Sequence, residues 1–176
     1  MLENLGLRVL EQVAYPLHAA HGLHGIDVFR VQDARGRALD VRRDGDRLIR
    51  AVEQLLAGGV DSDRLNRLVL AAGLTLREVA LLRAYQMVYA QVNTATSRSF
   101  VNDVLLANPE GVRPLLRYLE TRFDPALEGD RAAAMEEAES EVQQALGSVA
   151  TLPEDRVLRG LHDLMSATVR TNYFSG

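Results

Sequence analysis

The chain has 176 residues, and since one domain takes about 150, we expect one compact body. Its residues are 47% hydrophobic and 25% charged, as in soluble globular proteins, and the absence of cysteine excludes disulfides and thiolate chemistry. All 20 basic residues are arginine, which excludes Schiff-base catalysis by lysine, and the formal charge of -4 argues against a nucleic-acid partner.

Two strands are predicted near the N-terminus. Apolar side chains alternate over residues 5–16, and β-branched or aromatic residues dominate 25–32. Residues 18–25 would connect them as a hairpin, and a turn at 33–36 would lead into a short third strand at 38–41. Because such a ribbon is marginally stable alone, we expect it to pair with another copy of the chain or with a sheet upstream in a longer polypeptide.

Helical periodicity begins at Asp44. The first helix would end at the glycine pair 58–59, and its apolar face consists of Leu48, Ala51, Val52, Leu55 and Leu56. Asp61 or Ser62 would cap a second helix that ends at Gly73, with an apolar face of Leu65, Leu68, Val69 and Ala72.

The next helix start is the best defined in the sequence. Thr75 and Glu78 have the spacing of a capping box, in which each residue's side chain bonds to the backbone of the other. The helix that follows is predicted to bury Leu81, Leu82, Tyr85, Val88 and Val92.

Further helices are predicted at 99–107, 110–122 and 130–150, and a last one begins at Thr151. The 130–150 helix has a narrow apolar seam, which suits one partner helix, and we expect it to pair antiparallel with the last helix. The predicted fold class is therefore mainly α, a helical bundle with a small N-terminal antiparallel β-hairpin or ribbon (α+β).

Histidines supply the first candidate chemistry. His18, His21 and His24 recur every third residue, with Asp27 close by, and could supply ligands to a divalent metal. Period-three spacing does not bring side chains together on a strand, so a solvated hairpin connection is the favoured interpretation. His162, on the last helix, is interpreted as a satisfied surface or boundary residue.

Charged clusters are interpreted as solvated faces. The acidic cluster lies on the 130–150 helix and consists of Glu136, Glu137, Glu139 and Glu141. The basic cluster, Arg42, Arg43, Arg47 and Arg50, is interleaved with Asp40, Asp44 and Asp46, so its net field is small. The glycines form neither a G-x-G-x-x-G fingerprint nor a phosphate loop. We therefore assign no catalytic, cofactor-binding or metal-binding residue.

A helix-turn-helix DNA-binding regulator is a rival interpretation of residues 65–85. Its second helix carries only Arg77 and Arg83 as basic residues, and we expect Gln86, Gln91 and Asn93 on its exposed face. Without an arginine cluster, DNA binding is disfavoured. No stretch of 18 uncharged apolar residues occurs and the N-terminus lacks a basic segment, so we expect no membrane span, no signal peptide and a cytoplasmic location.

Several phrases, taken in order, resemble the large bacterial NAD-specific glutamate dehydrogenases. The first, residues 2–9 (LENLGLRV), is similar to the start of that family's last ACT-like segment. Four phrases resemble the helical segment that follows there: 66–70 (NRLVL), 73–75 (GLT), 77–79 (REV) and 82–85 (LRAY). Three more resemble the phrases that lead up to the family's catalytic domain: 122–125 (RFDP), 155–159 (DRVLR) and 170–174 (RTNYF).

The resemblance implies a parent enzyme that oxidises glutamate to 2-oxoglutarate and ammonium with NAD. In that family the catalytic lysines and the dinucleotide site lie beyond this segment, so we expect the chain to be inactive alone and to hold no cofactor. Residues 1–42 would be the end of an ACT-like module, and 43–176 a helical connector. The implied role is scaffolding and possible allostery, with an amino-acid effector and the rest of the polypeptide as partners. The alternative is a free-standing helical interaction module.

Overall fold

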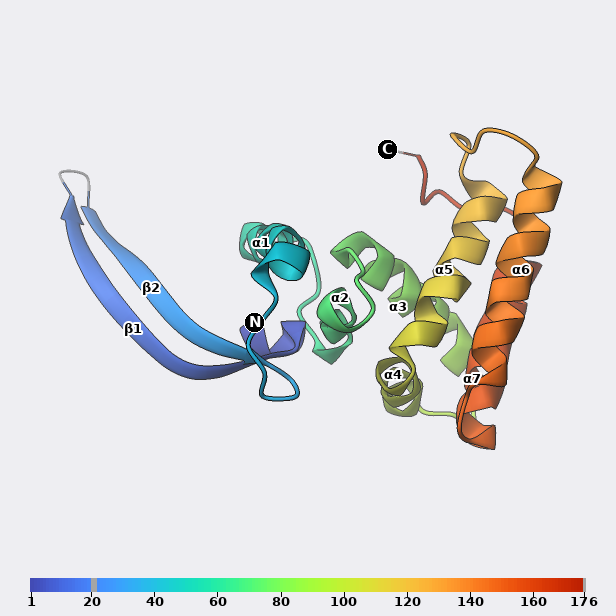
Figure 1. Ribbon diagram of the computed structural model, residues 1–176, viewed down its shortest axis with the longest axis horizontal. Helices are drawn as coiled ribbons and strands as arrows, with labels where there is room; N and C mark the ends of the chain where they lie inside the picture. The colour runs from blue at the N-terminus through green and yellow to red at the C-terminus, as the bar shows by residue number, and fades with distance from the viewer. Residues whose placement is uncertain (20–21, 176) are drawn as a thin grey trace.

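A long antiparallel ribbon extends from one end of a helical body (Figure 1). The computed structural model describes residues 1–19 and 22–175. Strands β1 (Leu7–Ala19) and β2 (Gly22–Asp33) form a 2-stranded sheet, with a register shift between Val9 and Glu11. The mainly helical fold with an N-terminal antiparallel ribbon confirms the predicted fold class.

A short 3-10 helix, η1 (Leu2–Leu5), joins the ribbon to the helical body. Leu5 and Leu7 are buried, whereas the strand residues beyond them are half-buried or exposed wherever their burial is described. Gly6 lies between them with φ 85, a left-handed conformation that favours glycine, and there the chain turns from η1 into β1. The base of the ribbon is therefore its anchored part.

The two strands are longer than predicted, and the prediction of a third strand at 38–41 is wrong. Most of the segment 18–25 continues the ladder instead of forming a loop, since β1 reaches Ala19 and β2 begins at Gly22. Residues 38–40 are not in a strand. Asp40 instead caps α1 (Val41–Ala57), because its side chain accepts hydrogen bonds from the backbone N–H groups of Arg42 and Arg43.

The second helical segment has a different cap from the predicted one. Asp63 accepts a hydrogen bond from the Leu65 N–H and starts η2 (Arg64–Arg67), so the prediction of Asp61 or Ser62 was wrong. The single turn α2 (Leu68–Ala71) follows, and Gly73, at φ 69, turns the chain away as expected.

Helix α3 (Leu76–Val92) begins at the predicted capping box, but its buried face differs from the predicted one. Val79, Leu82 and Tyr89 are buried, whereas Val88 is 44% and Val92 67% exposed. The reason is that α3 contacts η2, α4 and α7, so packing from several directions decides which side chains are covered.

Helices α4 (Arg98–Ala107), α5 (Pro109–Phe123), α6 (Arg131–Gly147) and α7 (Leu152–Ala167) complete the body. Helix α6 packs chiefly on α5 and only to a small extent on α7, so the expected pairing of the last two helices is a minor contact. The seam of α6 buries Ala138, Val142 and Leu146. All these helices contribute side chains to one hydrophobic core, which also includes Leu5 of η1.

Candidate functional site

The ribbon carries an uncovered apolar surface. Residues directly opposite in an antiparallel pair share a face, and Val13 lies opposite Val28 and Tyr15 opposite Ile26. With Leu17, these side chains form what we call the apolar ribbon face: Val13, Tyr15, Leu17, Ile26 and Val28, each between 38% and 53% exposed. The sequence predicted strands with one buried face, but among the described residues no layer covers that face.

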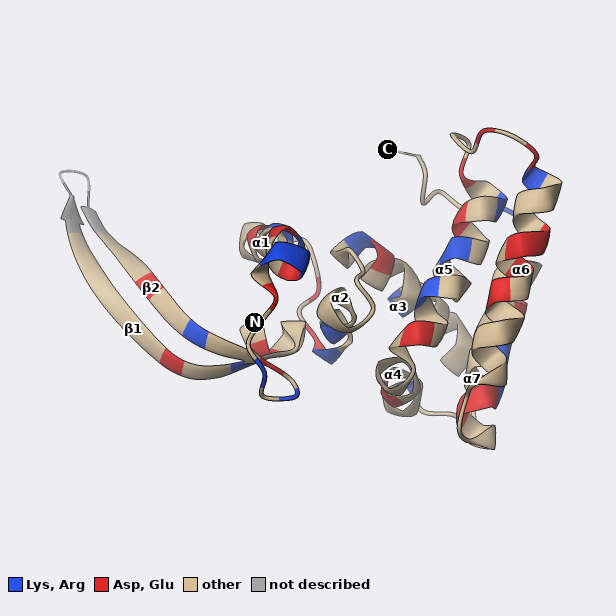
Figure 2. Ribbon diagram, viewed as in Figure 1, with Lys and Arg blue, Asp and Glu red and all other residues tan. Residues whose placement is uncertain are grey.

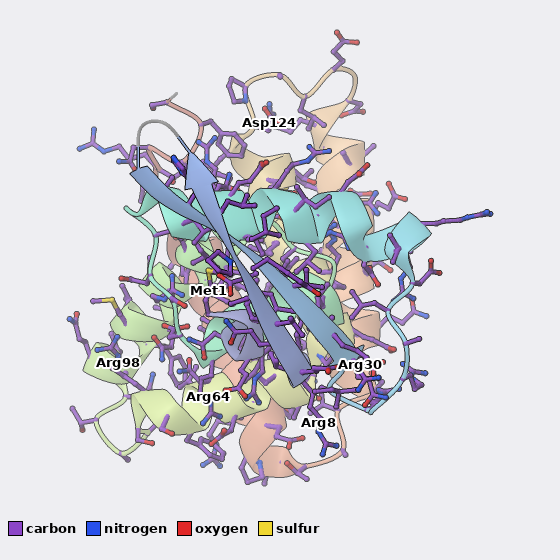
Figure 3. The ribbon with its side chains drawn as sticks, turned by 90° about the vertical axis from the view of Figure 1, so that its left-hand side faces the viewer. Met1, Arg8, Arg30, Arg64, Arg98 and Asp124 are labelled. Carbon is purple, nitrogen blue, oxygen red and sulfur yellow. The ribbon has the colours of Figure 1, made fainter. Side chains whose placement is uncertain are left out.

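The other ribbon face is more polar. There the Gln12 side-chain amide donates to the Asp27 carboxylate at 3.0 Å. On the apolar side, an ion pair of 3.1 Å between Arg30 and Glu11 marks the end of the apolar run nearest the body. Between Glu11 and Asp27 the sequence has no Asp, Glu, Lys or Arg. Figure 2 shows this change from charged base to uncharged outer part, and Figure 3 labels Arg8 and Arg30 near the base.

Such a surface points to association. Contiguous exposed apolar patches on soluble proteins commonly mark sites of protein contact. An isolated two-stranded ribbon is also at best marginally stable in water, so a further layer or strand would stabilise it. The apolar ribbon face is therefore the candidate functional site.

Only part of the candidate histidine metal site, His18, His21 and His24, can be located in the structure. The side chains of His18 and His21 lie outside the described residues, and His24 is exposed opposite Leu17. Within residues 1–19 and 22–175, no cluster of His, Asp or Glu is arranged to hold a metal ion. His162 is buried as a satisfied residue: its Nε2 lies 3.0 Å from Glu139, and its ring meets Tyr118 edge to face at 4.8 Å.

Part of each charged cluster forms ion pairs. The Asp44 carboxylate, which is buried, is held by Arg43 at 2.7 Å and Arg47 at 3.2 Å. On α6, Glu137 and Glu141 both pair with Arg117 of α5. The acidic face is thus a helix-to-helix contact in part, which the sequence pattern alone did not reveal.

A second polar cluster, not predicted as such, joins α3 to α5. One oxygen of Glu78 accepts from Thr75 N–H at 2.6 Å, and the other accepts from Arg113 at 2.6 Å. Arg113 also donates to the Gly73 carbonyl at 3.2 Å. Burial raises the pKa of the nearby Glu120 carboxyl, and the Glu78 charge raises it further. Only the Thr75–Glu78 part had a local sequence signal.

The C-terminal segment lies against α3. Arg77 donates to the Tyr173 carbonyl, and its guanidinium sits 4.6 Å from the centre of the Tyr173 ring. Nearer the end of α7, the hydroxyls of Tyr85 and Thr168 are 2.8 Å apart. Burial raises the pKa of both tyrosines. These contacts fix the path of the chain after α7.

The geometry also bears on the helix-turn-helix rival. Arg83 is buried and bonds to Asp63 and Asn66, each at 3.0 Å, instead of facing solvent. Gln86 is 2% exposed, so the expectation that it lies on the outer face of the helix was wrong; its amide donates to Asn102 at 2.8 Å. Arg83 and Gln86 therefore support packing, whereas Gln91 is exposed as expected. Among the described helices, none has the length and apolar character needed to span a membrane.

Comparison with known proteins finds one family model and several relatives to which the chain is similar. Residues 60–125, which contain α2 to α5, match the family described as "Glutamate dehydrogenase, helical motif 3". The chain is similar in sequence to one segment of proteins named NAD-specific glutamate dehydrogenase.

The similarity extends over almost the whole chain, ribbon included. It is 36% identical over 177 residues to the NAD-specific glutamate dehydrogenase of Halomonas elongata. The identity is 36% over 178 residues with that of Pseudomonas aeruginosa, and 33% over 181 residues with that of Mycobacterium tuberculosis. Each alignment covers 99% of this chain but only 11% of the relative, so the chain spans about a ninth of the length of the relatives that it matches.

Proposed function

We propose that the chain is a non-catalytic scaffolding and regulatory segment of an NAD-specific glutamate dehydrogenase. The parent enzyme would convert glutamate and NAD to 2-oxoglutarate, ammonium and NADH in the cytoplasm. The observation that carries this proposal is the match of 99% of the chain to 11% of such an enzyme. The lack of lysine and of a dinucleotide fingerprint in the sequence supports a role outside the catalytic step.

Within that role, residues 1–42 would be the end of an ACT-like module and 43–176 a helical connector. The uncovered apolar ribbon face supports an association role for the first part, since it requires a partner surface. The interlocked helices support a rigid connector for the second. An amino-acid effector that binds where ribbons associate would then act on the enzyme through this connector.

The deciding experiment is the size of the native polypeptide in source cells, measured with an antibody against this chain on a denaturing gel. A band several times larger than 19.4 kDa is expected. A band near 19.4 kDa would contradict the proposal and favour a free-standing helical interaction module.

Activity gives an independent test. We expect the purified chain to show no glutamate-dependent reduction of NAD, while the immunopurified native polypeptide from the same cells shows it. Activity of the chain alone would refute the non-catalytic role. Absence of activity from the native polypeptide would refute the dehydrogenase assignment.

Association is tested separately by light scattering on the purified chain. Because the ribbon has open strand edges, we expect self-association as the concentration rises. A strict monomer would remove strand-edge association from the proposal.

A further inference from the structure

The two edges of the ribbon differ, and the difference predicts where the next strand pairs. In an antiparallel pair, successive residues of a strand direct their backbone N–H and C=O groups alternately toward the partner strand and away from it. The edge that can accept a further strand is the one whose outward groups form an uninterrupted series.

Asp33 fixes the alternation in β2. The Asp33 N–H donates to the carbonyl of Arg37 at 2.8 Å, and Arg37 lies outside the ladder. The backbone N–H and C=O groups of Asp33 therefore point away from β1. The register shift lies on β1, between Val9 and Glu11, and β2 continues without an inserted residue. Counting back in steps of two, the outward residues of β2 are Gly25, Asp27, Phe29 and Val31, and we call their backbone groups the open β2 edge.

Pro16 provides an independent check. It lies opposite Gly25, and a proline has no N–H to donate to a ladder, so it is tolerated where the backbone nitrogen points outward. Both observations therefore give the same alternation. The outward residues of β1 opposite the open β2 edge are Gln12, Ala14 and Pro16.

The β1 edge is interrupted twice. Pro16 removes one outward donor, and the inserted residue at the register shift, Leu10, disturbs the strand nearer the base. Prolines and bulges are devices by which natural sheets prevent pairing at an edge. The open β2 edge has neither device from Gly25 to Val31, and within the described residues these groups have no backbone partner.

We propose that the open β2 edge, and not the edge of β1, is the pairing site of the chain, and that in the isolated chain its occupant is β2 of a second copy, antiparallel to the first. This inference rests on the association role proposed above and names its surface. The resulting sheet has the strand order β1-β2-β2-β1.

Two features of the chain favour this occupant. A two-fold axis through the pairing brings Ile26 and Val28 of both copies onto one side of the sheet, so the two apolar ribbon faces become continuous. Because the ribbon extends away from its helical body, antiparallel pairing places the two bodies at opposite ends of the sheet (Figure 1).

A matched pair of proline substitutions tests the proposal. Ala14 and Asp27 lie directly opposite each other, and the backbone N–H groups of both point away from the partner strand. Proline at either position therefore leaves the β1–β2 hydrogen bonds in place. We expect Asp27→Pro to weaken dimerisation about tenfold or more, whereas Ala14→Pro dimerises as the wild type does. Asp27→Ala controls for the lost hydrogen bond to Gln12 and is expected to dimerise normally.

Light scattering over a concentration series gives the mass of each variant, and far-UV circular dichroism checks that each is folded. Hydrogen exchange provides a second readout: the amides of Asp27, Phe29 and Val31 should become protected with dimerisation, and those of Gln12 and Ala14 should not.

Each contrary result has a distinct meaning. If Ala14→Pro alone dissociates the dimer, or if both or neither of the proline variants do, the edge assignment is wrong while strand-edge association can still hold. If the wild-type chain remains a monomer of 19.4 kDa, the second copy is not the occupant and the association role fails as well. The size of the native polypeptide tests the dehydrogenase assignment independently of both.

Discussion

Glu78 connects the start of α3 to α5 through both of its carboxylate oxygens. It completes the capping box with Thr75 and pairs with Arg113, and it is only 7% exposed. We expect Glu78→Ala to lower the free energy of unfolding by about 2–3 kcal/mol, because the Glu78 half of the capping box is lost and Arg113 loses its carboxylate. Urea denaturation measures this.

The matched control for that substitution is Glu136→Ala, at an exposed position of α6. It should change the free energy of unfolding by no more than about 0.5 kcal/mol. Equal effects of the two substitutions would show that the Glu78 contacts contribute nothing specific.

Glu120 predicts a pH dependence. Burial raises the pKa of its carboxyl in the folded chain, with a further rise from Glu78 that Arg113 partly opposes. The folded chain then binds the proton more tightly than the unfolded chain, so this group's contribution to stability falls as pH rises from the ordinary carboxyl value through the raised one. Glu120→Gln is uncharged at every pH.

We therefore expect Glu120→Gln to gain stability relative to the wild type between about pH 4 and about pH 7. Urea midpoints of both proteins at the two pH values measure it, with Glu136→Gln as the exposed control. A difference between variant and wild type that is the same at both pH values would contradict the assigned direction.

At the residue scale, local signals were predictable and distant partners were not. The Thr75–Glu78 capping box was predicted because both residues lie within one turn of the same helix. The partner Arg113 is 35 residues further along the chain, and no periodicity in the sequence indicates that pairing. The same limit explains why His162 was predicted to be satisfied without its partner Glu139 being known.

Among the helices, the contact between α3 and α7 depends on the lack of a side chain at Gly160. A Cβ at that position would overlap the ring of Tyr89, which is buried. We expect Gly160→Ala to destabilise the protein by about 1–3 kcal/mol through overpacking, although alanine is the better helix former. In a Tyr89→Leu background the penalty of the alanine should largely disappear.

Gly147, at the end of α6, is the matched control. A Cβ there meets nothing within 4 Å and its φ is not positive, so Gly147→Ala should be neutral or stabilise by up to about 1 kcal/mol. Thermal denaturation compares the two alanine variants. Equal behaviour at both positions would mean that Tyr89 moves aside without cost.

At the element scale, helix positions were predictable, but which side of each helix is covered was less so. Caps and glycines fixed most helix ends to within a few residues, as at Gly73 and Thr75. The burial of Gln86 and the exposure of Val88 reversed the expectation, because α3 is packed by elements from several parts of the chain. Hydrophobic pattern alone does not carry that information.

For the molecule as a whole, the helical body should fold without the outer ribbon. Apart from Leu7 at its base, no described strand residue belongs to the buried set. Replacing residues 9–31 with an Asn-Gly turn, which the hydrogen-bonded pair Arg8 and Gln32 would then flank, should shift the thermal midpoint by no more than about 2–4 °C and leave the helical circular dichroism intact. It should also abolish self-association. Loss of cooperative unfolding would show that the ribbon stabilises the body.

The sequence predicts a partner for the ribbon, because an isolated two-stranded ribbon is at best marginally stable in water, and this stays a prediction. The length of the strands could not be predicted, because residues 18–25 include glycines and histidines that are equally typical of a connection. The choice between edges required the register, and in particular the pairing of Pro16 with Gly25.

The narrow attachment of the ribbon at η1 and Gly6 has a mechanical consequence. A strand of 13 residues rising about 3.3 Å per residue is about 40 Å long. A tilt of the ribbon at its base therefore displaces its far end in proportion to this length. A tilt of about 10° at the base of the ribbon moves the far end by about 7 Å, which exceeds the spacing of about 4.8 Å between neighbouring strands. A rotation too small to repack the helices would thus be amplified into a displacement large enough to engage or release a paired strand.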